Sequence, residues 1–152
     1  MITRAIVSLA LVIACTAGIS AQDKPNFAGT WKASGSFNTW TITVEGNKMT
    51  VTMIVAGNSD STVYMLDGTP SPKAIEGPNG MVENIYTSNW EGDVLVTTIT
   101  GPPPAGMTLV ERRSLDADGT MKVQTKLTML RGKPAPPAPP GAEEPQVLKK
   151  VK

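Results

Sequence analysis

The stretch Trp40–Val55, which reads WTITVEGNKMTVTMIV, decides the fold class of this chain. On both sides of its centre, apolar residues alternate with polar ones, mainly threonines, and this period of two is the pattern of a β-strand with one buried face. Gly46 and Asn47 at the centre tolerate the positive φ that a tight hairpin turn requires. The stretch therefore predicts two antiparallel strands joined by a turn. The second strand would face the core with Met49, Val51, Met53 and Val55.

The same alternation recurs along the chain, broken by Gly, Pro, Asn and Asp, and it predicts an all-β fold. Residues 69–80 hold Pro70, Pro72 and Pro78, so we expect a loop there, because proline cannot donate a ladder hydrogen bond. The expected strands are residues 27–34, 39–44, 49–55, 61–66, 83–90, 93–100, 107–115, 120–130 and 146–151.

Consecutive hairpins of this kind favour an antiparallel up-and-down meander. Closing such a meander into a barrel of about eight to nine strands removes the exposed edges through which strands aggregate. The fold expected from the residues alone is therefore an antiparallel barrel without helices.

Residues 1–21 have the layout of an export signal. Arg4 supplies a positive charge, Ala5–Ala14 is apolar, and small residues end at Ala21. The apolar run is shorter than the roughly 20 residues that cross a bilayer, so we expect no membrane span. The prediction is cleavage before Gln22 and a periplasmic or secreted protein. The alternative is a lipid anchor at Cys15, because Val12–Cys15 resembles a bacterial lipobox.

The sequence divides the remainder into three parts. Residues 22–131 are the expected barrel core, and residues 132–145 are a proline-rich loop. Residues 146–152 are expected to form a closing strand that pairs with the first strand, the alternative being a disordered tail.

The composition excludes several function classes. The chain has no His, and its one Cys lies in the leader, so a nucleophile–histidine pair and a zinc, haem or copper site are not expected. Basic and acidic residues are interspersed, which argues against a nucleic-acid partner. Asp116, Asp118 and Gly119 lack the pattern of a calcium loop and fit a turn. The remaining candidates for acid–base chemistry are Glu83, Glu91, Asp93 and Glu111, and each also fits a solvated face or turn.

Methionine is frequent, with eight in the chain. Its flexible side chain can line a cavity that adapts to apolar ligands, or it can fill an irregular core. Trp31, Trp40 and Trp90 are expected to anchor the core. The candidate cavity lining consists of Met49, Val51, Met53, Met121, Val123 and Met129.

The segment Asn26–Lys32 contains Gly29-Thr30-Trp31, which resembles the Gly-x-Trp signature of lipocalins, fatty-acid-binding proteins and avidins. The fuller layout is similar to small exported bacterial lipocalin-like proteins, with turns at Asp67-Gly68, Trp90–Asp93 and Asp118-Gly119. This resemblance implies a lipocalin-like, calycin-type barrel that holds a small apolar ligand. It also implies structural roles for Gly29 and Trp31, with the Trp packing across the closed end.

Two function classes follow. The first is a non-enzymatic exported barrel that binds a small hydrophobic ligand, without cofactor or metal. The second is a structural or protein-interaction domain with a filled core, which displays its proline-rich loop to a partner.

Overall fold

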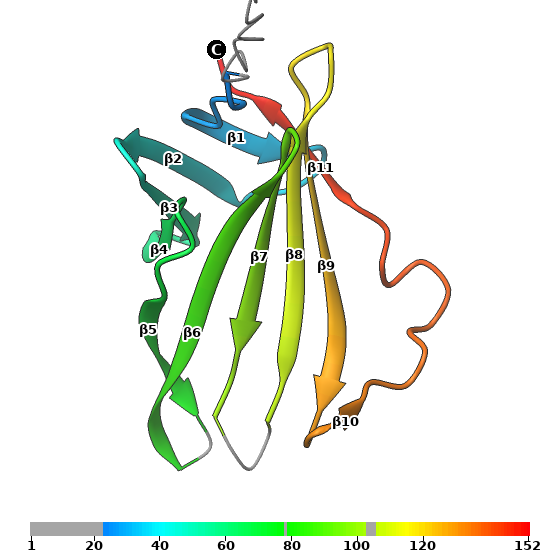
Figure 1. The fold of residues 1–152 in the computed structure, drawn as a ribbon. Helices are drawn as coiled ribbons and strands as arrows, with labels where there is room; N and C mark the ends of the chain where they lie inside the picture. The colour runs from blue at the N-terminus through cyan, green and yellow to red at the C-terminus, as the bar shows by residue number, and fades with distance from the viewer. Residues whose placement is uncertain (1–22, 78, 103–105) are drawn as a thin grey trace, which may run out of the picture.

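The structure is a computed structural model that describes residues 23–77, 79–102 and 106–152. All the regular elements in these ranges are β-strands (Figure 1). They are β1 (Gly29–Ala33), β2 (Thr39–Glu45), β3 (Lys48–Val55), β4 (Asn58–Met65), β5 (Ser71–Gly77), β6 (Gly80–Glu91), β7 (Val94–Thr100), β8 (Thr108–Leu115), β9 (Met121–Leu130), β10 (Lys133–Pro134) and β11 (Gln146–Lys150).

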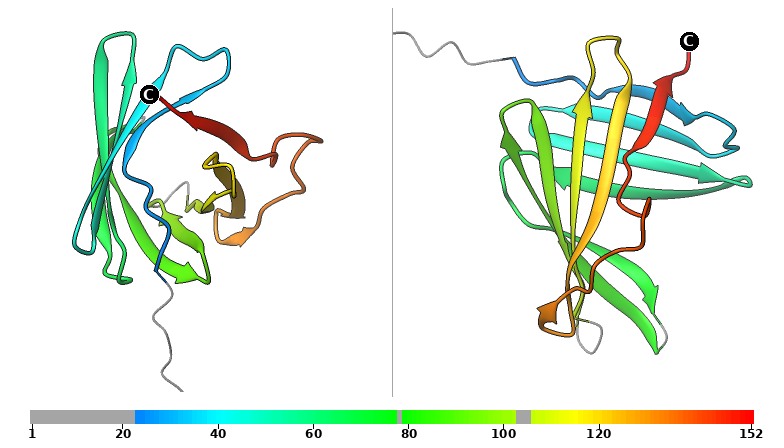
Figure 2. Two further views of the ribbon diagram at one scale, coloured as in Figure 1. Left: turned by 90° about the horizontal axis from the view of Figure 1, so that it is seen from above. Right: turned by 90° about the vertical axis from the view of Figure 1, so that its right-hand side faces the viewer.

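The strands form one antiparallel sheet in the order β4-β3-β2-β1-β11-β9-β8-β7-β6-β5, and the short β10 pairs with the end of β9. The sheet curls on itself, so that β1–β4 cross the long strands β6–β9 (Figures 1 and 2). The last strand, β11, lies between β1 and β9 and pairs with both. Among the described residues no backbone ladder joins β4 to β5, so the barrel is nearly closed.

The register places every second residue of each strand inside the barrel. Trp31 lies opposite Trp40, and Trp40 lies opposite Met53, so three strands contribute to one inner face. Val44 and Val55 share that face but lie near the strand ends, where both are exposed. The buried hydrophobic core is Phe27, Trp31, Ile42, Met49, Val51, Tyr64, Leu95, Met121 and Leu148.

The Gly-x-Trp segment is fixed by packing across the β1–β11 pair. Trp31 is 1% exposed, and its Nε1 donates a hydrogen bond to the carbonyl oxygen of Phe27 at 2.8 Å. Lys150 lies over the Trp31 ring, with Nζ 5.6 Å from the centroid. Gly29 has a φ of 137°, and a Cβ there would clash with Lys150 Cε. The backbone conformation therefore requires glycine, whereas the Lys150 side chain could move to relieve the clash.

The expected strand count was wrong, because the sheet has eleven strands. The prediction of a loop over residues 69–80 was also wrong, since Ser71–Gly77 forms β5. Within the sheet order β5 is an end strand that forms a ladder with β6, and an edge strand tolerates a proline such as Pro72. The fourth strand begins at Asn58 because the turn before it is shorter than predicted and consists of Ala56 and Gly57, both with positive φ.

The predicted leader, residues 1–21, lies outside the described residues, and so does Cys15. Within the described ranges, no helix is long and apolar enough to cross a membrane.

Candidate ligand-binding site

The inner faces of six strands line a partly open cavity of about 220 Å³. Most of the apolar part of its wall comes from β2, β3, β9 and β11, while β4 and β8 supply most of the polar part. The lining residues are Trp40, Ile42, Val51, Met53, Asp60, Thr62, Tyr64, Glu111, Arg113, Met121, Val123, Thr125, Gln146 and Leu148.

Four residues of the predicted lining lie on this wall: Val51, Met53, Met121 and Val123. Met49 is fully buried in the core, where its Sδ lies 3.7 Å from Arg113 Nη1. Met129 is not among the residues that line the cavity; it pairs with Thr108, beyond a register shift between β8 and β9.

Sequence reasoning missed the polar part of the wall. Glu111 and Arg113 on β8 point inward together with Leu109, because residues two apart share a face. Asp60 and Thr62 do the same on β4. The alternation along β8 places Glu111 and Arg113 on the inner face. Their charge nevertheless indicated a position that faces solvent.

A buried ion pair crosses the inner face of β8. Arg113 Nη2 lies 2.9 Å from Glu111 Oε1, and the side chains are 5% and 14% exposed. The guanidinium carbon also lies 5.2 Å from the centroid of the Tyr64 ring. Arg113 Nε is buried and has no acceptor among the described residues. A buried donor without a partner costs free energy, so this group favours an acceptor beside it.

Tyr64 remains a neutral hydrogen-bonding group in this environment. Burial raises the pKa of its phenol far above the ordinary value, and the nearby Glu111 carboxylate raises it further. Its ring packs edge-to-face against the ring of Tyr86, with the two centroids 5.5 Å apart. Burial also raises the pKa of Tyr86. Both phenols are therefore uncharged at neutral pH.

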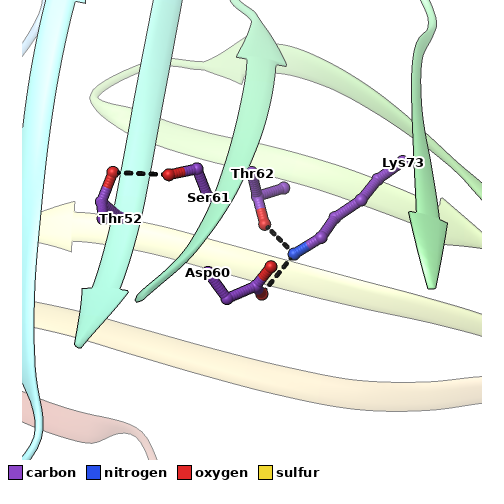
Figure 3. A network of polar contacts seen from close by, with 5 residues as sticks. All are labelled: Thr52, Asp60, Ser61, Thr62 and Lys73. Atoms are coloured by element: carbon purple, nitrogen blue, oxygen red, sulfur yellow. Dashed lines mark hydrogen bonds and ion pairs between the residues drawn. The ribbon is translucent and has the colours of Figure 1, made fainter. Parts of the chain in front are cut away.

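A second ion pair closes the seam between β4 and β5 (Figure 3). Lys73 on β5 reaches across the seam, and its Nζ lies 2.5 Å from Asp60 Oδ2 and 2.8 Å from Thr62 Oγ1. Side chains thus connect two strands that no ladder joins. On the outer face of β4, Ser61 bonds to Thr52 of β3 at 2.8 Å.

The candidate acid–base carboxylates do not converge. Glu111 is paired with Arg113, Glu91 with Arg112 at 2.9 Å, and Glu83 is exposed on the outside of β6. Asp93 is exposed in the turn between β6 and β7.

The predicted Asp116–Gly119 turn is present, and the Gly119 amide donates a hydrogen bond to the Asp116 carbonyl oxygen at 2.9 Å. Asp118 accepts a hydrogen bond from the Thr120 amide at 2.9 Å, and Asp116 pairs with Lys122. In the described ranges, no three acidic residues gather as metal ligands would.

Solved structures with a similar fold have little sequence similarity to the chain. No protein-family model and no curated protein matches it. A structure titled REP1-NXSQ fatty acid transporter is similar, with 14% identity, a TM-score of 0.55, and coverage of 82% of this chain and 96% of that one. The fold is a calycin-like barrel.

Two further structures support that assignment. One is a secretary abundant heat soluble protein from Ramazzottius varieornatus, with 12% identity, a TM-score of 0.56, and coverage of 82% of this chain and 95% of that one. The other is a mutant of the fluorescent protein UnaG, with 16% identity, a TM-score of 0.56, and coverage of 83% and 96%. At these identities the similarity concerns the fold.

Proposed function

We propose that this chain is a non-enzymatic binding protein that carries a small, mainly apolar molecule inside its barrel. The observation that carries the proposal is the interior cavity, whose wall includes Trp40, Ile42, Val51, Met53 and Leu148. A structure of the same fold is titled a fatty acid transporter, which supports a carrier role.

Burial against the apolar wall is the main source of the expected binding free energy. A ligand that buries about 200 Å² of apolar surface gains about 5 kcal/mol at about 25 cal/mol per Å². Losses of translational and side-chain freedom offset part of that gain, while hydrogen bonds to the polar side of the wall add to it. We therefore expect dissociation constants of about 0.1 mM or weaker.

Export is the second part of the proposal. It rests on the leader pattern of residues 1–21, with release into the periplasm or the medium after cleavage and a lipid anchor at Cys15 as the alternative. Compartments outside the cytoplasm are oxidising and favour disulfide formation. The chain has no Cys after residue 15, so no thiol of the folded part can form an unwanted disulfide there.

Native mass spectrometry of the protein purified from its own host tests the carrier role. The expected result is a bound small molecule that organic solvent removes. Trp40 lies on the cavity wall, so adding the extracted molecule back should change tryptophan emission in the wild type and much less in Trp40→Phe. A barrel that carries no molecule and gives no emission change with apolar probes contradicts the proposal.

A second candidate rests on the proline-rich loop between β10 and β11. Its prolines Pro136, Pro137, Pro139 and Pro140 are exposed. The loop is held in place, since Gln124 Nε2 donates to the Glu143 carbonyl at 2.6 Å. Exposed proline segments bind aromatic grooves of partner domains at low entropic cost. A partner captured by the full chain and lost on deletion of residues 136–140 would favour this function.

A further inference from the structure

Each charged side chain on the cavity wall already has a partner of opposite charge. Arg113 is neutralised by Glu111 at 2.9 Å, and Asp60 is neutralised by Lys73 at 2.5 Å. Tyr64 adds a neutral phenol. No cation on the described wall is left to pair with an entering anion.

An anionic ligand would therefore be placed in an unfavourable field. It would lose its hydration and lie near two carboxylates, Asp60 and Glu111, while the guanidinium of Arg113 stays shared with Glu111. Burying a charge without its own counter-charge is strongly unfavourable. A neutral polar group avoids this cost and can still accept a hydrogen bond.

The wall also offers neutral hydrogen-bonding groups. Thr62, Tyr64 and Gln146 line the cavity, and none of them is charged at neutral pH. A hydroxyl or carbonyl oxygen of a ligand can bond to these groups without adding charge.

The cavity is also small. A volume of about 220 Å³ equals roughly seven water molecules at about 30 Å³ each. Sites for drug-sized molecules start at about 300 Å³. A molecule of seven or eight non-hydrogen atoms fills this space, whereas much of a chain of sixteen carbons would extend beyond it.

From these observations we infer that the ligand is a compact, uncharged molecule with an apolar body and one hydroxyl or carbonyl oxygen, which hydrogen-bonds to the neutral polar side chains of the wall. This inference rests on the proposed carrier function and specifies its ligand class. It distinguishes the chain from a carrier of long-chain fatty carboxylates.

Isothermal titration calorimetry at pH 7 with 1-heptanol, 2-heptanone, heptanoate and hexadecanoate tests the inference on the mature protein. The alcohol and the ketone should bind at least about tenfold more tightly than heptanoate, because the carboxylate has no free counter-charge. Hexadecanoate should bind no better than heptanoate.

Glu111→Gln is the informative variant, since it frees the charge of Arg113. Heptanoate affinity should rise by about tenfold or more, while 1-heptanol affinity changes less than about threefold. Arg112→Gln is the matched control on the same strand, because Arg112 faces outward and pairs with Glu91. Neither affinity should change in this control.

Asp60→Asn provides a second route if Glu111→Gln does not fold. Asp60 is largely exposed, and the substitution releases Lys73 beside the cavity. Heptanoate affinity should again rise relative to 1-heptanol. Unchanged selectivity in every folded variant overturns the inference.

The outcomes separate the two proposals. If heptanoate or hexadecanoate binds the wild type more tightly than 1-heptanol and 2-heptanone, the inference fails and the carrier function stands. If none of the four compounds binds and no molecule accompanies the protein from its host, both fail.

Discussion

Replacement of Trp31 by alanine should lower the free energy of unfolding by about 3–5 kcal/mol, the range for a buried large aromatic. The side chain is 1% exposed. A tryptophan removes about 150–250 Å² from water, which is worth about 4–6 kcal/mol at about 25 cal/mol per Å². Alanine retains part of that burial, and the cavity left behind adds to the loss.

The hydrogen bond can be separated from the packing by a second substitution. Trp31→Phe keeps most of the apolar contact but removes the bond from Nε1 to the Phe27 carbonyl. That carbonyl is then left without its donor, so we expect a smaller loss of about 1–3 kcal/mol. The order of stability should be wild type, Trp31→Phe, Trp31→Ala.

Urea unfolding followed by circular dichroism measures these differences. For a domain of this size, about 3–5 kcal/mol corresponds to a fall in melting temperature of about 10–20 °C. Phe37→Ala is the control, because Phe37 is 95% exposed in the segment between β1 and β2, and a change within about 0.5 kcal/mol is expected. A loss below about 1 kcal/mol for Trp31→Ala would refute the packing argument at this end of the barrel.

Three further predictions concern the ends of the chain and the buried phenol. N-terminal sequencing of the protein from its host should return Gln22; a diacylated Cys15 would instead place the protein on a membrane surface. Deleting residues 146–152 should cost several kcal/mol or cause aggregation, because it removes Leu148 from the core and leaves β1 and β9 without their partner. Deleting residues 136–140 should be mild, since shortening a surface loop changes the closure entropy little, and an equal effect of the two deletions on the melting temperature would contradict this. The pKa of Tyr64 is raised in the folded state, so its contribution to stability is full below about pH 10 and is lost as the pH rises above the pKa of the phenol in the unfolded chain. Native protein at pH 10–11 should therefore show far less tyrosinate absorbance than urea-unfolded protein. Equal absorbance would disprove the burial effect.

The all-β class and most hairpins were predictable because they depend on local patterns. The alternation in Trp40–Val55 produced β2 and β3, and the turn residues between 90 and 94 produced the β6–β7 pair. Each of these features depends only on residues close together in the sequence. The period of two sets which face of a strand is buried, and the turn residues set where the chain reverses.

The edges of the barrel were less predictable. Prolines around Pro72 indicated a loop, but an edge strand tolerates proline where the missing donor is not needed. The start of β4 was placed too late because Asn58–Asp60 is polar, although these residues pair with β3. Ladder pairing stabilises a strand regardless of its hydrophobicity.

The sequence by itself therefore determined the antiparallel pattern, the absence of histidine chemistry and the anchoring residues of the first strand. Only the tertiary structure decided that Asp60 meets Lys73 and that the paired Arg113 and Glu111 lie on the cavity wall. The physical reason is that a charged side chain in a strand has the same local signal whether it faces water or a partner. The partner is set by sheet closure, which brings together residues far apart in the chain.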